Sequence, residues 1–460
     1  GSVRGICRVT AYTSVTVVSM EVLKAFGGIS ASEDWEEGKW SEYRGWPTAV
    51  AIYEGRLWWA GMDSQNGSVS DGYESYDHTV LGDSGPVETI NWILPLDRLM
   101  LGGQGSEFQC RSNAFDEPLT PTNFNIKQVS TQGSAPVAAV QVDAQGIFVQ
   151  RGGSRVFELN MDAGSLNYQS TQLSALAPEI GDPGIVRIAV QRQPDTRIHF
   201  VRSDGTVALL VFDKVENVIC WVEVETPGAD GLIEDVCILP GDAGEKEDHV
   251  YYQVARTING STVRYFERWA TEDSCHGASM SKLADSFIAR TGAAATVITG
   301  LGHLEGEDVV VWADGVAYPD TDTTLQYTVN GGQITLGTAA SNVMVGLYYK
   351  AQWKGGKLVT LQAPHGTPLA QHKRISAVGL ILAWVHAKGL KFGPDFTHLD
   401  DMPMIEEGTA VGANAVWDVY DHEPIIFPST WDTDARLCLE AAAPRPCTIL
   451  AAIADAEVHD

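Results

Sequence analysis

The feature that most constrains the fold of this 460-residue chain is a short strand-like run that recurs five times. Measured from Arg56, Arg98, Gly146, Arg197 and His249, successive runs lie 42, 48, 51 and 52 residues apart. They read GRLWWA, DRLMLG, GIFVQ, TRIHFV and DHVYYQ, and the last three each precede a turn with Gly or Asn and a second strand-like run. A period of about 40 to 50 residues, with several short strands in each unit, is typical of a β-propeller. A large β-sandwich, or a row of them, is the alternative.

The first unit is the most aromatic one. Within Trp40–Gly61, the run AVAIY and the run RLWWA stand on either side of a Glu54-Gly55 turn, and the sequence GSVSDGYESYD follows a few residues later. Val, Ile, Tyr and Trp favour strands, and a Gly-containing turn between two such runs predicts a hairpin. We expect this hairpin to belong to the first visible blade, with Trp46, Trp58 and Trp59 packing between sheets.

The character of the sequence changes after Ala270. The polar stretch TEDSCHGASMS is followed by short alternating runs around an Asn330-Gly331-Gly332 turn, which predict a small antiparallel β-barrel. Strand-like runs then continue to the end of the chain. We therefore predict an all-β protein with a β-rich lead-in (1–39), a β-propeller-like domain (40–270), a small β-barrel domain (271–352) and a C-terminal β-rich segment that packs back on the body (353–460). The chain starts without Met or a signal-peptide pattern, so the lead-in is expected to end a longer N-terminal region.

The charge is strongly negative, with 59 acidic and 31 basic residues and a formal net charge of −28. Affinity for nucleic acid comes mostly from Lys and Arg, so the average surface is not expected to hold DNA or RNA. Solubility is the simplest interpretation of this charge. The more specific one is a surface past which DNA slides without sticking. The chain has no run of 18 apolar residues, and we expect no membrane span.

The seven cysteines contain no CxxC pair and no His at zinc-ligand spacing, which predicts reduced, mostly buried thiols; a Cys438–Cys447 disulfide is the disfavoured alternative.

Gly82–Pro86 (GDSGP) resembles a serine-protease loop but lacks the required His and Asp partners. Ser203–Thr206 partly matches the Asp-box turn of sialidases, and Asp63–Glu74 and Asp320–Thr324 loosely match cation loops.

We interpret each of these segments as a turn or a solvated loop. The glycine-rich Gly102–Gly105 and Gly300–Gly306 lack the strand–turn–helix context and the Lys of nucleotide loops. Paired carboxylates would suit a glycosidase, but with 59 acids their proximity in sequence is uninformative. The sequence therefore predicts no catalytic residue, no cofactor-binding residue, no metal ligand and no cofactor, and we expect the protein not to be an enzyme.

Stretches along nearly the whole chain resemble one family of proteins. They occur in one order and comprise Trp40–Gly61, Ser68–Asp77, Ile90–Phe108, Leu119–Ala135, Ile147–Leu159, Arg202–Asp213, Ala255–Ala270, Gly300–Gly315, Gly389–Phe396 and Phe427–Leu439. Together they resemble the tail nozzle proteins of short-tailed bacteriophages (podoviruses), which are also called tail tubular protein B-like. Members of this family extend upstream of Val3.

The resemblance implies a structural virion protein that contains a β-propeller. It implies a homo-hexameric tube below the phage portal and its adaptor, which conducts double-stranded DNA at ejection without binding it specifically and carries tail fibres or spikes. Such a protein belongs to the virion tail and is assembled in the host bacterial cytoplasm. An acidic lumen would repel DNA during its passage. The alternatives are a host-surface carbohydrate-binding or -degrading tail protein, and a cellular propeller scaffold unrelated to phage.

Overall fold

The computed structural model describes residues 5–33, 35, 46–61, 67–71, 77–80, 89–112, 118–120, 123–226, 228, 230–319, 327–359, 371–406, 408–421 and 424–458. These residues form strands joined by turns, with three short 3-10 turns: η1 (Pro178–Gly181), η2 (Glu272–Cys275) and η3 (Gly302–Leu304). The all-β prediction is confirmed. All seven cysteines are free, and Cys7, Cys220 and Cys237 are exposed, so the prediction of mostly buried thiols is too simple.

Five small antiparallel sheets follow one another along the chain, each made of consecutive strands. The first four sheets have four strands and the fifth has three. Their strands are β3 (Ala49–Tyr53), β4 (Arg56–Ala60), β5 (Gly67–Asp71) and β6 (Asp77–Val80); β7 (Ile90–Pro95), β8 (Leu99–Gly103), β9 (Glu107–Ser112) and β10 (Phe124–Ser130); β11 (Val140–Val142), β12 (Gln145–Val149), β13 (Val156–Asp162) and β14 (Asn167–Gln172); β15 (Ile185–Gln191), β16 (Arg197–Arg202), β17 (Val207–Asp213) and β18 (Val218–Val224); and β19 (Leu232–Leu239), β20 (His249–Ile258) and β21 (Ser261–Arg268).

The five recurring runs of the sequence are the second strands of these sheets, namely β4, β8, β12, β16 and β20. A second strand has a hydrogen-bonded neighbour on both edges and at least one face packed on an adjacent sheet, which explains why the run is apolar each time. In β8 all five residues are buried. Because successive side chains point to opposite faces of a strand, Leu99 and Leu101 pack toward the first sheet and Met100 toward the third.

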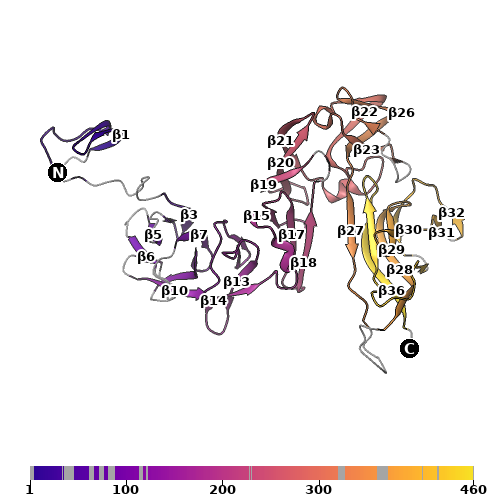
Figure 1. Ribbon diagram of the computed structural model, residues 1–460, viewed down its shortest axis with the longest axis horizontal. Helices are drawn as coiled ribbons and strands as arrows, with labels where there is room; N and C mark the ends of the chain where they lie inside the picture. The colour runs from indigo at the N-terminus through magenta and orange to yellow at the C-terminus, as the bar shows by residue number, and fades with distance from the viewer. Residues whose placement is uncertain are drawn as a thin grey trace.

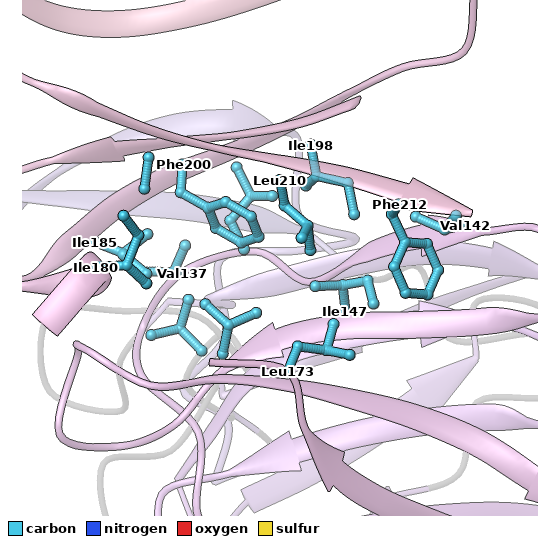
Figure 2. Close-up of a cluster of buried hydrophobic side chains, with 14 of the residues drawn as sticks. Val137, Val142, Ile147, Leu173, Ile180, Ile185, Ile198, Phe200, Leu210 and Phe212 are labelled. Carbon is cyan, nitrogen blue, oxygen red and sulfur yellow. The ribbon is translucent and has the colours of Figure 1, made fainter. Parts of the chain in front are cut away.

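Each sheet buries a cluster of side chains against the next one. The largest of these clusters lies between the third and fourth sheets and includes Ile147 of the third sheet and Phe200 and Leu210 of the fourth, all fully buried (Figure 2). Trp58 is likewise fully buried between the first two sheets, as predicted, whereas Trp46 is 57% exposed and the prediction that it packs between sheets is wrong. Sheets stacked in this way make the chain propeller-like, and Figure 1 shows the described sheets as an open arc, with the fifth well separated from the first.

A two-stranded hairpin precedes the arc. It consists of β1 (Ile6–Ser14) and β2 (Val17–Lys24), which pair only with each other among the described strands. Figure 1 shows it standing away from the sheets, at the end of the molecule opposite to the C-terminal strands. We call this hairpin the arm.

After the arc, a curved sheet takes the place of the predicted β-barrel. Its strand order is β22-β26-β23-β24, and β25 pairs with β23, so that among the described residues the sheet has two free edges and does not close. The reason lies in β22 and β26, which bend at β-bulges and fold the sheet over its own core without bringing β22 to β24. The strands are β22 (Asp285–Thr299), β23 (Asp308–Ala313), β24 (Val316–Tyr318), β25 (Tyr327–Thr328) and β26 (Gln333–Leu347).

The C-terminal residues form two further antiparallel sheets that share one core. The first has the order β27-β35-β29-β30; in the second, β28 pairs with β33, β34 and β36. Leu380 of β28 and Phe392 of β29 belong to the same buried cluster, as in a β-sandwich. The strands are β27 (Lys350–Lys354), β28 (Lys373–His386), β29 (Leu390–Asp395), β30 (His398–Asp401), β33 (Val416–Tyr420), β34 (Ile425–Ile426), β35 (Cys438–Ala442) and β36 (Thr448–Val458), with a separate ribbon of β31 (Ile405–Glu406) and β32 (Thr409–Ala410).

Candidate functional site

Several of the segments considered for chemistry are turns in the structure. Ser203–Thr206 joins β16 to β17, and Asp204 Oδ1 accepts hydrogen bonds from the Thr206 backbone N–H (3.1 Å) and hydroxyl (2.6 Å). Gly102–Gly105 closes the β8–β9 hairpin, where a Cβ on Gly102 would meet the Trp92 ring at 2.0 Å. In Gly300–Gly306, the Glu305 carboxylate accepts the backbone N–H groups of Gly331 and Gly332. Gly82–Pro86, Asp320–Thr324 and most of Asp63–Glu74 lie outside the described residues.

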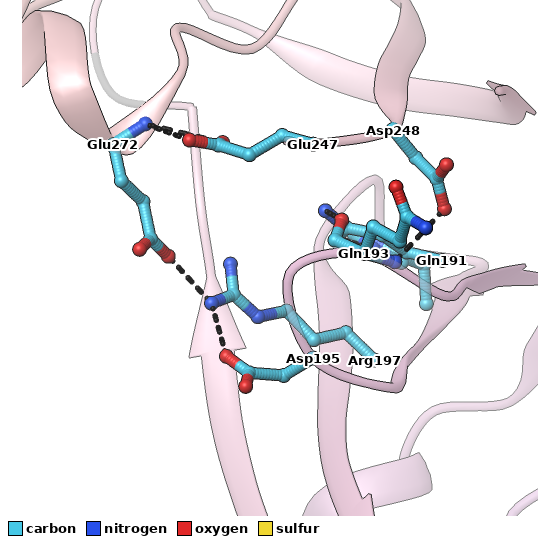
Figure 3. A network of polar contacts seen from close by, with 8 residues as sticks. Gln191, Gln193, Asp195, Arg197, Glu247, Asp248 and Glu272 are labelled. Atoms are coloured by element: carbon cyan, nitrogen blue, oxygen red, sulfur yellow. Dashed lines mark hydrogen bonds and ion pairs between the residues drawn. The ribbon is translucent and has the colours of Figure 1, made fainter. Parts of the chain in front are cut away.

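A polar network joins the fourth sheet, the fifth sheet and the segment that leaves the arc (Figure 3). Arg197 Nη2 lies 2.9 Å from Asp195 and 2.5 Å from Glu272. Glu247 accepts the backbone N–H of Glu272 with both carboxylate oxygens, at 2.9 and 3.1 Å. Burial, together with Glu272 and Asp273, raises the pKa of Glu247. These contacts hold three separate loops in place.

A buried histidine lies next to this network, on β16. His199 is fully buried, and its Nδ1 lies 2.7 Å from the Tyr252 hydroxyl while its Nε2 lies 3.3 Å from Gln191 Oε1. Trp269 packs edge-on against the ring at 5.3 Å between centroids. Burial, and secondarily the charge of Arg197, lowers the pKa of His199 to about 3. A histidine that is enclosed and neutral in this way joins strands of two sheets and has no exposed atom to offer a substrate.

The second buried polar cluster lies where the arc meets the curved sheet. Arg256 of β20 is fully buried and donates to Glu267 from Nε (2.9 Å) and Nη2 (2.8 Å). The same Nη2 reaches Asp285 of β22 at 3.0 Å, and the Ser286 hydroxyl donates to Glu267 at 2.8 Å. Burial raises the pKa of Asp285 to about 6, with Glu267 adding to the shift and Arg256 opposing it. One cation thus fastens two carboxylates from consecutive sheets.

A cleft of about 600 Å³ lies in the C-terminal sandwich. Asp395, Asp432, Asp434 and Arg436 are among its lining residues, and Arg436 Nε donates to Asp434 at 2.9 Å. Hydrogen bonds from Thr397 and His398 lower the pKa of Asp395, and the backbone N–H groups of Asp434 and Thr433 lower that of Asp432. A glycosidase acid needs a raised pKa. These two carboxylates are therefore arranged to stabilise loops in their ionised form.

The described residues contain no group of three or more His, Cys, Asp or Glu side chains placed to hold a metal ion. In the same part of the chain we find no helix with the length and hydropathy needed to span a membrane.

The arm carries an exposed apolar surface on one of its faces. Its register places Cys7 opposite Val22, Val9 opposite Met20 and Tyr12 opposite Val18, on one face of the hairpin. All six side chains are exposed, Tyr12 to 70%. The other face is mixed: Arg8 and Glu21 lie 3.8 Å apart on it, beside the exposed Ile6 and Val17. We call the six-residue apolar surface the arm face.

Sequence reasoning missed both buried polar clusters. Glu267 and Asp285 lie 11 and 29 positions from Arg256, too far apart for any local motif to connect them. A signal does exist, because an arginine within the apolar run VYYQVARTI is unexpected in a buried strand unless it is paired. Alternation in VVSMEVLK places Val18, Met20 and Val22 on the arm face. In ICRVTAYTS alternation places only Cys7 and Val9 there, and Tyr12 joins them through a register shift after Val9 that the sequence does not indicate. The exposure of the face does not follow from either run.

Comparison with known proteins gives similarities of structure only. No protein-family model matches the chain, and no curated protein matches it. A protein from Lactobacillus plantarum is similar over 73% of this chain and 98% of its own, with 14% identity and a TM-score of 0.33. A candidate 6-phosphogluconolactonase from Bacteroides uniformis has the same coverage, 12% identity and a TM-score of 0.31. An auxiliary nutrient binding protein from Bacteroides thetaiotaomicron covers 51% of this chain and 58% of its own, with 12% identity and a TM-score of 0.28. At such scores, the likenesses bear on neither the activity nor the partners of this chain.

Proposed function

We propose that the chain is a structural virion protein, a tail nozzle subunit that forms part of the DNA ejection conduit of a short-tailed phage. The observation that carries the proposal is the exposed arm face. An isolated two-stranded hairpin is at best marginally stable in water, and a contiguous apolar surface marks a site of association. A hairpin such as β1–β2 is therefore best explained as an assembly element.

The shape and the charges of the described chain agree with this proposal. The sheets form an elongated series of units (Figure 1), and ionic contacts of Arg197 and of the fully buried Arg256 join parts of successive units. A series of joined sheets suits a subunit of a tube. Because each copy has a net charge of −28, a tube of six copies should have little electrostatic affinity for the phosphates of DNA that passes through it.

The resemblance to tail nozzle proteins supplies the particular assembly. The partners in this proposal are five further copies of the chain, a portal–adaptor complex on one side, and tail fibres or spikes on the flank. The proposed location is the phage tail, assembled in the host cytoplasm.

The direct test combines the purified chain with the portal–adaptor complex encoded beside it. We expect a six-fold ring at the distal end of the adaptor, visible by electron microscopy, and a matching mass increase. A folded chain that leaves the adaptor bare at micromolar concentration would overturn the proposal. An adaptor complex from an unrelated phage serves as the control and should stay undecorated.

A host-surface carbohydrate-binding or -degrading tail protein is the second candidate. The cleft of about 600 Å³ in the C-terminal sandwich favours it, because Asp395, Asp432 and Arg436 line it and can hydrogen-bond sugar hydroxyls. Trp431 is next in sequence to the lining residues Thr430 and Asp432 and is 40% exposed, with Arg374 over its ring. Incubation of the folded chain with host polysaccharide tests it. Release of oligosaccharides, or retention on the polysaccharide that is lost in Trp431→Ala, would favour this candidate over the nozzle.

A further inference from the structure

The arm face has a counterpart at the other end of the molecule. In the sheet centred on β28, one face packs on the sandwich core through Val378, Leu380 and Leu382. The alternate residues of β28 point away from that core and include Gly379 and Ile381. Register places Gly379 opposite Ile453 and Ile381 opposite Ala451 of β36, on the same outward side.

This outward side is apolar and open. Ile453 is 63% exposed, Val419 of β33 is 63% exposed and Ile426 of β34 is 84% exposed. We call the surface formed by Gly379, Ile381, Val419, Ile426, Ala451 and Ile453 the outer face.

We propose that the arm face of one copy of this chain packs on the outer face of a second copy. The inference deepens the proposed function, because it names the surfaces through which subunits would join. The arm face is the surface of a two-stranded hairpin and the outer face is the surface of a larger sheet, and sheets pack face to face through alternating side chains. The outer face is shallow at Gly379 and Ala451, whereas the arm face presents the long side chains of Tyr12 and Met20. Large side chains thus meet small ones.

Position favours a second copy over the same chain. Figure 1 shows the arm and the sheet of β28 and β36 at opposite ends of the longest axis, so one molecule presents both halves of the contact without joining them. A contact between two different surfaces of identical chains is heterologous, and it closes into a ring or continues as a filament. A ring is the geometry that a conduit requires.

The charges are complementary in sign. The arm strands contain Arg8 and Lys24 against Glu21, a net positive charge in a chain whose net charge is −28. In the strand β36, Glu457 is already paired with Arg374 of β28 at 2.8 Å, whereas Asp455 lies in register with Ala377 beside the outer face. The net positive arm is therefore attracted toward Asp455, while the net negative charge of the whole chains opposes less specific contacts.

Two substitutions test the contact from its two sides. Val9→Asp places a charge on the arm face, and Ile453→Asp places one on the outer face. Because an unpaired charge would be buried in the contact, we expect each to weaken self-association of the full chain about a hundredfold or more. The measurement is mass distribution against concentration by sedimentation, in reducing buffer because Cys7 is exposed. Ser19→Asp on the opposite side of the arm and Thr409→Asp on β32 are the matched controls and should associate like the unsubstituted chain.

Mixing the two variants makes the test specific for a heterologous contact. The Val9→Asp chain retains its outer face and the Ile453→Asp chain retains its arm face, so together they should form a one-to-one dimer that neither forms alone and that does not grow further. An unsubstituted chain that stays monomeric, association that ignores both substitutions, or a mixture that fails to dimerise would each overturn the inference. These results are separable from the proposed function, because adaptor binding is measured independently.

Discussion

The arc of sheets buries its apolar side chains, whereas the two ends of the chain leave apolar side chains exposed. In the arc, a strand such as β8 is covered on both faces, and Leu99, Met100 and Leu101 are fully buried between consecutive sheets. At the ends, β1–β2 and the sheet of β28 and β36 each leave an apolar face open. The same strand-forming residues therefore stabilise the monomer in one region and are free for association in the other.

Ionic contacts separate the regions in the same way. Arg197 of the fourth sheet pairs with Glu272 just beyond the fifth sheet, and the fully buried Arg256 of the fifth sheet pairs with Asp285 of the curved sheet. The arm has only an exposed pair, Arg8 and Glu21, at 3.8 Å. Exposed pairs contribute little, whereas a buried charge that loses its partner is costly. The arc should thus be sensitive to substitutions that the arm tolerates.

The largest expected effect comes from removing a large side chain between two sheets of the arc. Phe200→Ala should lower the free energy of unfolding by about 3–5 kcal/mol, because a fully buried ring is replaced by a cavity. Val9→Ala on the arm face, measured where the chain is dilute, should change it by less than about 0.5 kcal/mol. Denaturant titration followed by circular dichroism checks both. Similar costs for the two substitutions would break the contrast between arc and arm.

The next effect concerns Arg256. Replacement by Met leaves Glu267 and Asp285 buried without their cation, which should cost about 3 kcal/mol. Arg264→Met is the matched control, because Arg264 makes a bidentate contact with Glu234 on the same sheet but is exposed. It should leave the denaturation midpoint almost unchanged. Equal midpoints for the two variants would show that Arg256 does not fasten the arc to the curved sheet.

The arc was predictable from the sequence because its signal is local. Each recurring run is a central strand with at least one buried face, so it keeps an apolar pattern at a regular spacing. The exit from the arc was harder to predict, since Arg256 meets Asp285 across 29 residues and no short pattern connects them. The predicted barrel failed for a related reason. Alternation in β22 and β26 predicts strands, but the bulges that bend them are set by packing.

His199 gives the arc a dependence on pH. The pKa of His199 is about 3 in the folded chain, against an ordinary value of 6.5. Between these two values the unfolded chain binds a proton at this histidine and the folded chain does not. Folding stability should therefore fall by about 2 kcal/mol between pH 7 and pH 5 through this group. In His199→Phe, that part of the pH dependence should vanish. Unfolding free energies of both proteins at the two pH values provide the check, and parallel pH profiles would refute the assignment.

Asp285 should act in the opposite direction and more weakly. Its pKa is about 6 in the folded chain against an ordinary value of 3.8, so the folded chain binds the proton more tightly than the unfolded one. Its contribution to stability should therefore rise by about 1 kcal/mol as the pH falls from 7 to 5, and be lost again as the pH rises through 6. Asp285→Asn removes this gain while it keeps the size of the side chain, so the variant should lose more stability on acidification than the unsubstituted chain. His199 lies within the arc and Asp285 lies at its end. The pH dependence of the unfolding free energy in the two variants therefore separates acid sensitivity inside the arc from acid sensitivity at its exit. A variant with the same acid slope as the unsubstituted chain would mean that Arg256 keeps Asp285 ionised throughout this range.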